Sequence, residues 1–495
     1  MQTSIRHNKP IALMVCWLSL MVAGFSACQP SVMNYTLTDR LPAISPDYTA
    51  ITLPPNIAPL NFQIDEQGED FVAKIWSANN DTLTVHCAGG KIQIDENRWK
   101  NIISNNKGMK LCIAVFALHN GRWTRFKTIE NQIANEPIDS YMAYRLVEPL
   151  FETWDQMGIY QRCLENFDEK AVMANTMSDG NCMNCHAFNK NSSRTMMFHM
   201  RGRWAGTYIY REGKLEKVNT KTDQTISPGV YPSWHPNGRD IAFSVNHIAQ
   251  TFHAMAEKKV EVLDTISDII LYDAVRNEVF SNKAFSTKNR LETFPSWSPD
   301  GKWLYYCSAL KPQPFRYDQV KYDLLRVNYN EETRTFGVPD TIVSSQKNGK
   351  SVSFPRISPD GKYVLFALSD YGNFSIWHRE SDLYLLDIEN NIIGKPDINS
   401  NETESYHTWS SSGRWIVFSS RRTDGLFTRP YFCYFDSDGK AHKPFLLPQK
   451  DPAYYNTFLK SYNIPELVTS EIELTPGDIA NIMKNQAKDA KYMSN

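Results

Sequence analysis

The sequence predicts a mainly β protein whose largest part is a β-propeller. Similar phrases recur between residues 229 and 436, and each combines a turn with a short apolar strand. Residues 47–145 add further short, partly alternating segments separated by turn residues. Aromatic side chains make up 12% of the 495 residues, which also favours strands. A chain of this length is expected to form two or three domains.

Four phrases define the repeat. They begin at Tyr231, Phe294, Phe354 and Tyr406 and read YPSWHPNGRDIAFSVN, FPSWSPDGKWLYYCSA, FPRISPDGKYVLFALS and YHTWSSSGRWIVFSSR. Their equivalent positions are Trp234, Trp297, Ile357 and Trp409, at spacings of 63, 60 and 52 residues. Ser-Pro-Asp-Gly is typical of a type I turn, since Pro fixes φ at the second place and Gly suits the fourth. We therefore expect residues 206–455 to form a propeller of four blades and one or two more.

These phrases resemble the TolB-type, WD-like propeller repeat. The resemblance recurs over roughly 230 residues, which makes it more specific than any single copy. It implies a fold and no particular activity.

The N-terminal residues are typical of an exported protein. Arg6 and Lys9 precede an apolar run at residues 11–25, which is short for a membrane span and suits a secretory signal. Small residues then lead to Cys28. A formal net charge of −1 without a basic tail argues against nucleic acid as a partner.

The step Phe-Ser-Ala-Cys that ends at Cys28 resembles a bacterial lipobox, with Phe in place of the usual Leu. The resemblance implies a signal peptide over 1–27, lipidation of Cys28 and a tether over 28–46. We expect a lipid-anchored protein of the bacterial cell envelope, at the outer membrane and facing the periplasm. An ordinary signal peptide with an incidental cysteine is the alternative.

The chemistry of the chain concentrates at Cys182-Met183-Asn184-Cys185-His186. Two thiols can add across the two vinyl groups of a haem, and the adjacent histidine can then bind the iron. The motif resembles the c-type cytochrome attachment site, which assigns Cys182 and Cys185 to thioether bonds and His186 to the proximal iron position. A thiol redox pair and a structural zinc site are the alternatives, but no βαβ frame or second ligand pair accompanies the motif.

The sequence does not decide which residue would be the distal iron ligand, or whether that position is filled by the protein at all. His199 lies 13 residues beyond His186, with Met197 and Met200 beside it, although buried methionines are more often core residues than ligands. The first repeat unit offers a second group, since it is longer than its siblings and carries His235, His247 and His253. Loops that outgrow a repeat often bind ligands, so these histidines are candidates for contact with the haem or a metal.

Three domains follow from these patterns. Residues 47–145 are predicted to form a β-sandwich-like domain with one short helix at RWKNIIS, and residues 146–205 a haem-attachment segment. Residues 206–455 form the propeller, and 456–495 a tail with a helix that starts at Thr475-Pro476-Gly477-Asp478.

The whole combination resembles a family of Bacteroidetes-type envelope lipoproteins, through phrases such as GNCMNCHAF, FHMRG and IAFSVNHIAQTFH. One covalent haem c on a membrane-tethered scaffold predicts electron transfer to or from an envelope redox protein. We favour this role over catalysis because no acid–base group is visible beside the motif. A propeller that binds protein or glycan with a structural haem, and a peroxidase-type haem enzyme, are the alternatives.

Overall fold

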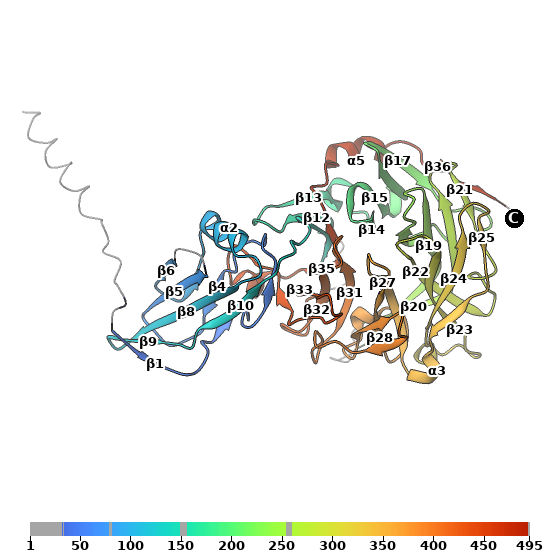
Figure 1. Cartoon of the computed structure of the whole chain (residues 1–495). Coiled ribbons are helices and arrows are strands. Elements are labelled where there is room, and N and C mark those ends of the chain that lie inside the picture. The colour runs from blue at the N-terminus through green and yellow to red at the C-terminus, as the bar shows by residue number, and fades with distance from the viewer. Residues whose placement is uncertain (1–31, 33, 79–81, 149–155, 254–259, 494–495) are drawn as a thin grey trace, which may run out of the picture.

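A computed structural model describes residues 32, 34–78, 82–148, 156–253 and 260–493. The chain forms a smaller N-terminal β domain and a larger propeller, which lie side by side (Figure 1). The fold is therefore mainly β, as predicted. The predicted signal peptide (1–27) and Cys28 lie outside the described residues. Within those residues, no helix combines the length and the apolar character needed to cross a membrane.

The N-terminal domain contains two sheets and one helix around a shared apolar core. The larger sheet comprises β1 (Tyr35–Leu37), β3 (Thr52–Leu53), β5 (Asp70–Ser77), β6 (Leu83–Cys87), β8 (Lys110–His119), β9 (Arg122–Arg125) and β10 (Ile129–Ile133). The smaller comprises β2 (Ile44–Ser45), β4 (Phe62–Ile64) and β7 (Lys91–Ile92). Because β1 and β2 pair with strands of this domain, part of the predicted 28–46 tether belongs to the domain.

The single helix of this domain, α2 (Glu96–Asn105), contains the predicted RWKNIIS segment. Asp95 caps it, since its side chain accepts a hydrogen bond from the backbone N–H of Arg98. Trp99 and Ile103 are fully buried on its inner face. The helix forms because the cap and the spacing of its apolar residues agree.

The propeller has six sheets within the described residues, one for each blade. Blade 1 comprises β35 (Ser461–Val468), β11 (Tyr141–Val147), β12 (Gly158–Cys163) and β13 (Glu169–Ala174). Blade 2 comprises β14 (Met183–Asn189), β15 (Ser192–Met200), β16 (Gly206–Arg211) and β17 (Lys214–Asn219). Blade 3 comprises β18 (Val230–Trp234), β19 (Asp240–Phe252), β20 (Val260–Asp273) and β21 (Glu278–Phe280).

The remaining blades follow the predicted repeat. Blade 4 comprises β22 (Arg290–Trp297), β23 (Trp303–Leu310), β24 (Asp323–Asn330), β25 (Thr335–Phe336) and β26 (Asp340–Val343). Blade 5 comprises β27 (Ser351–Ile357), β28 (Tyr363–Ser369), β29 (Asp382–Asp387) and β30 (Ile392–Gly394). Blade 6 comprises β31 (Glu404–Trp409), β32 (Trp415–Ser420), β33 (Arg429–Tyr434) and β34 (Phe445–Leu446).

The ring closes because blade 1 is built from two distant parts of the chain. The C-terminal strand β35 pairs antiparallel with β11 and becomes the innermost strand of that blade. The innermost strands contact one another in the order β35, β14, β18, β22, β27, β31 and back to β35. A closed ring leaves no innermost strand exposed along its length, which removes a site of aggregation.

The domain boundaries in the structure therefore differ from the predicted ones. The propeller strands run from residue 141 to residue 468, so 146–205 is not a separate segment but supplies strands to blades 1 and 2. The tail 456–495 is not mainly helical. It contributes β35, and its helix α5 (Pro476–Met483) gives way to β36 (Lys488–Asp489) and β37 (Lys491–Tyr492), which pair with β17 and β21.

Every innermost strand carries the same bulge. The first bulge residue has a positive φ, between 45° and 56°, a backbone conformation that residues other than glycine rarely adopt. The six residues are Cys185, Tyr231, Phe294, Phe354, Tyr406 and Ile464. Strand register shifts at each of these positions, as expected for a bulge. Cys185-His186 thus occupies in blade 2 the place of the aromatic–proline pairs in blades 3, 4 and 5.

The repeat turns form as predicted. In blade 4 the backbone N–H of Gly301 donates to the carbonyl of Ser298 at 2.9 Å, which closes the turn. The hydroxyl of Ser298 accepts from the backbone N–H of Trp303 at 3.0 Å and donates to Asp300. The same network recurs in blade 5 around Ser358. The Ser and Asp of the repeat therefore hold the first two strands of a blade in register.

We expect the closure by β35 to be essential for stability. Leu467 in β35 is fully buried, so Leu467→Ala should lower the free energy of unfolding by about 2–5 kcal/mol. Leu459, just before β35, is 66% exposed, and Leu459→Ala should change it by less than about 0.5 kcal/mol. Chemical denaturation of both variants checks this. Equal stabilities would show that β35 does not close the ring.

Candidate functional site

A cavity opens at one end of the propeller axis. Its empty volume, counted out to the open mouth, is about 1110 Å³. The innermost strands supply much of its wall, with Asn184, Tyr231, Tyr406, Asn463 and Ile464 among the lining residues. The lining also includes Arg145, Glu148, Met157, Cys182, Arg201, Ile248, Gln250, Val262, Phe374, Trp377 and Arg421.

A narrower section of the channel adjoins this cavity, and the ring of bulge residues lines it. Neighbouring aromatic rings are in contact there: the centroids of Tyr231 and Phe294 are 4.8 Å apart, and those of Phe294 and Phe354 are 4.0 Å apart. Cys185 is the blade 2 member of this ring. Tyr231, Tyr406 and Ile464 line both spaces, so the cavity and the narrow section adjoin at these residues.

The two cysteines of the motif face these two adjoining spaces. Cys182 is half-buried and lines the cavity. Cys185 is 3% exposed and lines the narrow section, where burial raises the pKa of its thiol and the backbone N–H of Tyr231 donates to it. Both thiols are free in the structure. The two thiols therefore border two adjoining spaces, and Cys182 is the more exposed of the two.

His186 is buried in the ring beside Cys185. Its Nε2 lies 2.8 Å from the carbonyl oxygen of Ile464 in β35, so Nε2 carries the proton in this hydrogen bond. Burial lowers the pKa of His186 to about 4, which keeps the imidazole neutral near pH 7. Nδ1 is buried without a hydrogen bond among the described residues. The Ala143 carbonyl nevertheless lies near enough to favour the protonated ring.

Blade 6 has an equivalent histidine that the sequence motif did not reveal. His407 follows Tyr406 as His186 follows Cys185, and it lines the same narrow section. Its Nε2 lies 2.9 Å from the carbonyl oxygen of Leu365, and burial lowers its pKa to about 3. A histidine at this place in the bulge can therefore hold neighbouring blades together without any cofactor.

The structure places the predicted distal ligands away from the cavity. His199 is 4% exposed in β15, contacts the Thr207 hydroxyl at 3.3 Å and lines a separate pocket. Burial lowers its pKa to about 4. Met197 is fully buried in an apolar cluster between blades 2 and 3, and Met200 in one between blades 1 and 2. Among the described lining residues, Met157 is the only methionine or histidine of the cavity.

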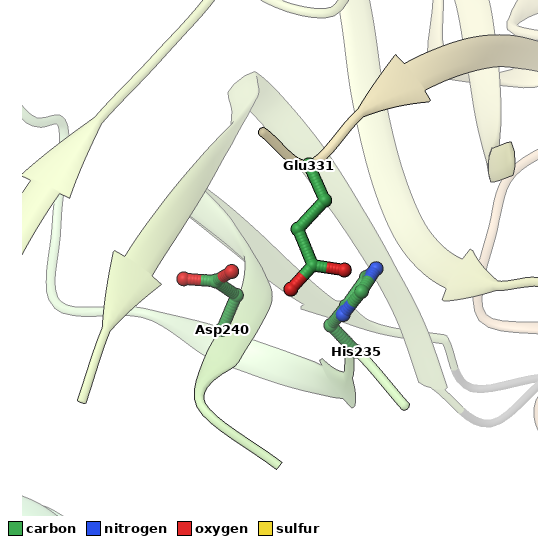
Figure 2. Close-up of side chains that lie close together, drawn as sticks. All are labelled: His235, Asp240 and Glu331. Carbon is green, nitrogen blue, oxygen red and sulfur yellow. The ribbon is translucent and has the colours of Figure 1, made fainter. Parts of the chain in front are cut away.

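The three histidines of blade 3 are not brought together either. His235 lies with Asp240 and Glu331 in a cluster whose ligand atoms are within 4.8 Å of one another (Figure 2). Both nitrogens of His235 are engaged, Nε2 with the Gly301 carbonyl and Nδ1 with a backbone N–H. Arg334 and Arg239 also pair with Asp240. The cluster is thus an ion-pair network that holds the turn.

The other two histidines lie on an extended arm formed by β19 and β20. His247 is exposed, and His253 directly follows the last residue of β19, Phe252. The arm crosses to blade 5, where Glu261 accepts from Tyr371 at 2.7 Å and Asp264 from Asn373 at 2.7 Å. The extra residues of blade 3 therefore cover the cavity, to which the arm contributes Ile248, Gln250 and Val262.

Buried charges fasten this arm. Burial alone would lower the pKa of His378 in blade 5, but Glu261 and Glu380 raise it to about 9. The charged imidazole in turn lowers the pKa of Glu380 to about 2. Burial raises the pKa of Asp264 to about 7 although Asn246 and Asn373 donate to it. The arm is held by one charged cluster and by one carboxyl that is partly protonated near neutral pH.

Comparisons with known proteins add only distant likenesses. No family model and no curated protein matches the chain. Among solved structures, a nidogen/laminin complex has 8% identity and a TM-score of 0.37, over 67% of this chain and 100% of that one. A chain from a structural analysis of two prolyl endopeptidases has 12% identity and a TM-score of 0.34, over 62% of this chain and 42% of that one. Prolyl oligopeptidase B from Galerina marginata has 8% identity and a TM-score of 0.36, over 78% of this chain and 52% of that one. No functional conclusion follows from them.

We expect the arm to loosen at high pH. A histidine whose pKa is higher in the folded state stabilises that state fully below pH 6.5, and the contribution fades as pH rises through about 9. His378→Gln should therefore reduce stability at pH 6 by roughly 3 kcal/mol or less, and much less at pH 10. Denaturant unfolding at the two pH values measures this, with the exposed His247→Gln as control. An unchanged difference at both values would contradict it.

Proposed function

We propose that this chain is a lipid-anchored envelope cytochrome of the c type, in which one haem is attached through Cys182 and Cys185 in the propeller cavity and carries single electrons. The observation that carries the proposal is that the motif borders an open, mainly apolar cavity at the propeller axis. Each thiol would add across one vinyl group, so that sulfur bonds to one carbon and the thiol hydrogen goes to the other.

The chemistry of the walls supports a haem. The cavity combines apolar and aromatic side chains, such as Phe374 and Trp377, with cationic arginines. Apolar walls suit a macrocycle, and guanidinium groups suit its carboxylates. When bound, an iron porphyrin supplies one-electron redox chemistry. The propeller and the N-terminal domain would supply docking surfaces for an envelope redox partner.

Iron binding by the His186 imidazole would require one change in its hydrogen bonding. His186 is neutral, as metal binding requires, and its Nδ1 has no hydrogen-bond partner among the described residues. For Nε2 to bind iron, it must leave the carbonyl of Ile464. We therefore propose that haem attachment and a rotation of the His186 ring occur together.

Mass spectrometry and a pyridine haemochrome spectrum test the proposal, on protein produced in a host that matures c-type cytochromes. The wild type should gain the mass of one haem. Cys182→Ala should lose one thioether bond, which shifts the haemochrome band, and the double variant with Cys185→Ala should be colourless. Cys87→Ala, a half-buried thiol of the N-terminal domain, should behave as wild type. Colourless wild-type protein would overturn the proposal.

Met157 is the candidate in this cavity for a second iron ligand, because it and Cys182 line the same cavity. Methionine ligation raises the potential of a haem. Met157→Leu should therefore lower the midpoint potential by on the order of 0.1 V, within the ~0.8 V range that axial ligands span. Met197→Leu is the control, since Met197 is packed in a blade core. Equal potentials in a redox titration would exclude Met157 as the ligand.

A propeller that binds an organic ligand without a covalent haem is the second candidate function. The observation that favours it is the equivalence of Cys185-His186 to the bulge pairs of the other blades. These residues have a place in the fold that needs no iron. Colourless protein with an intact cavity would support this alternative.

A further inference from the structure

Three arginines line the cavity without an ion-pair partner among the described residues. They are Arg145 in β11, Arg201 after β15 and Arg421 after β32. The only acidic residue among the described lining residues is Glu148. Among the described residues, the cavity lining therefore has an excess of positive charge, which an anion would balance.

Arg421 is the most desolvated of the three. Burial lowers its pKa to about 10, which is the direction expected for a cation held away from water. Its Nε is buried without a hydrogen-bond partner in the described part of the chain. The nearby acids do not neutralise it, because Glu402 pairs with Arg379 at 2.9 Å and Asp424 lies 4.0 Å from Arg429.

Arg145 lies in blade 1, next to blade 6, which carries Arg421. Its Nη2 donates to the side chain of Asn463 at 3.0 Å, whereas its Nε is buried and without a partner among the described residues. Asn463 therefore fixes the guanidinium in place and leaves donors available. Arg201, the third of these arginines, is exposed to solvent and also lines the cavity.

The remaining wall suits a flat, apolar ligand. The guanidinium carbon of Arg421 lies 4.2 Å from the ring centre of Trp377, so the aromatic face and the cation adjoin. Phe374 and Tyr231 continue this wall, with their ring centroids 6.0 Å apart. Ile248 and Val262 of the arm cover it. Aromatic surfaces next to guanidinium groups favour planar molecules that carry carboxylates.

We propose that the cavity is a binding site for a planar aromatic ligand with two carboxylates, which Arg421, Arg145 and Arg201 bind by charge-assisted hydrogen bonds. This deepens the proposed function, since the two propionates of a haem are carboxylates of this kind. It does not depend on the thioether bonds, because the arginines act on the carboxylates and not on the vinyl groups. The two proposals can therefore fail separately.

Mesoporphyrin IX is the probe, because it is planar, has two carboxylates and lacks the vinyl groups that thiols attack. It is titrated into haem-free protein and followed by its absorbance. Arg421→Gln should weaken binding about 10- to 100-fold, as expected for the loss of a charge-assisted hydrogen bond of ~1.5–3 kcal/mol. Arg201→Gln, at an exposed position, should weaken it in the same direction without risk to folding.

Arg203→Gln is the matched control. Arg203 lies two residues from Arg201 but pairs with Asp179 and does not line the cavity. It should bind within about twofold of wild type. The dimethyl ester of the same porphyrin, which has no carboxylate charge, should bind weakly to wild type and equally to every arginine variant.

The outcomes separate the two proposals. Equal binding of mesoporphyrin by wild type and by Arg421→Gln and Arg201→Gln would overturn the arginine site, even if matured protein carries a covalent haem. Arginine-dependent binding in a protein that matures without colour would support the site and overturn the cytochrome proposal. Thermal unfolding followed by circular dichroism shows whether a variant is folded before it is scored.

Discussion

The pairing of β35 with β11 is the contact on which the rest of the structure depends. It joins residues 318 positions apart at the hydrogen bond between Arg145 and Asn463. The closure supplies Ile464, the sixth member of the bulge ring, and its carbonyl holds His186. It also builds the cavity wall, because these strands contribute five of the lining residues: Arg145, Val147, Ser461, Asn463 and Ile464. The fold and the candidate site are therefore consequences of one long-range pairing, whose entropy cost the buried strands must offset.

The sequence revealed the blades whose signals are local. Blades 3 to 6 could be predicted because an aromatic residue, a turn and an apolar strand recur within a short phrase. Blade 2 has the same bulge, but Cys185-His186 replaces the aromatic–proline pair. The sequence of this blade therefore does not match the repeat phrase. Blade 1 had no phrase to find, since its innermost strand comes from the tail. Backbone geometry requires a bulge at this place and leaves the residue type free.

The candidate site was predictable only where chemistry is encoded by spacing. The spacing of Cys182 and Cys185 indicated a shared site, and the structure places them at two adjoining spaces. Chain length allowed His199 to reach the motif, but length does not decide which face of a strand a side chain occupies, and β15 directs His199 to a separate pocket. Met157 and Arg421 come from distant segments and carry no motif. Only the closed ring brings those segments together at one cavity.

His186 shows how the fold and the proposed chemistry compete for one atom. While Nε2 donates to the Ile464 carbonyl, the buried ring is neutral and the ring closure is satisfied. If Nε2 binds iron, that carbonyl loses its donor inside the protein, at a cost of about 1–3 kcal/mol. His407 makes the equivalent bond to Leu365 with no cysteine in its own bulge, so the position alone favours the structural role. What distinguishes His186 is Cys185 beside it and Cys182 nearby. Only covalent attachment through these thiols would hold iron close enough to outweigh the lost hydrogen bond, which makes the thioether bonds the precondition for ligation.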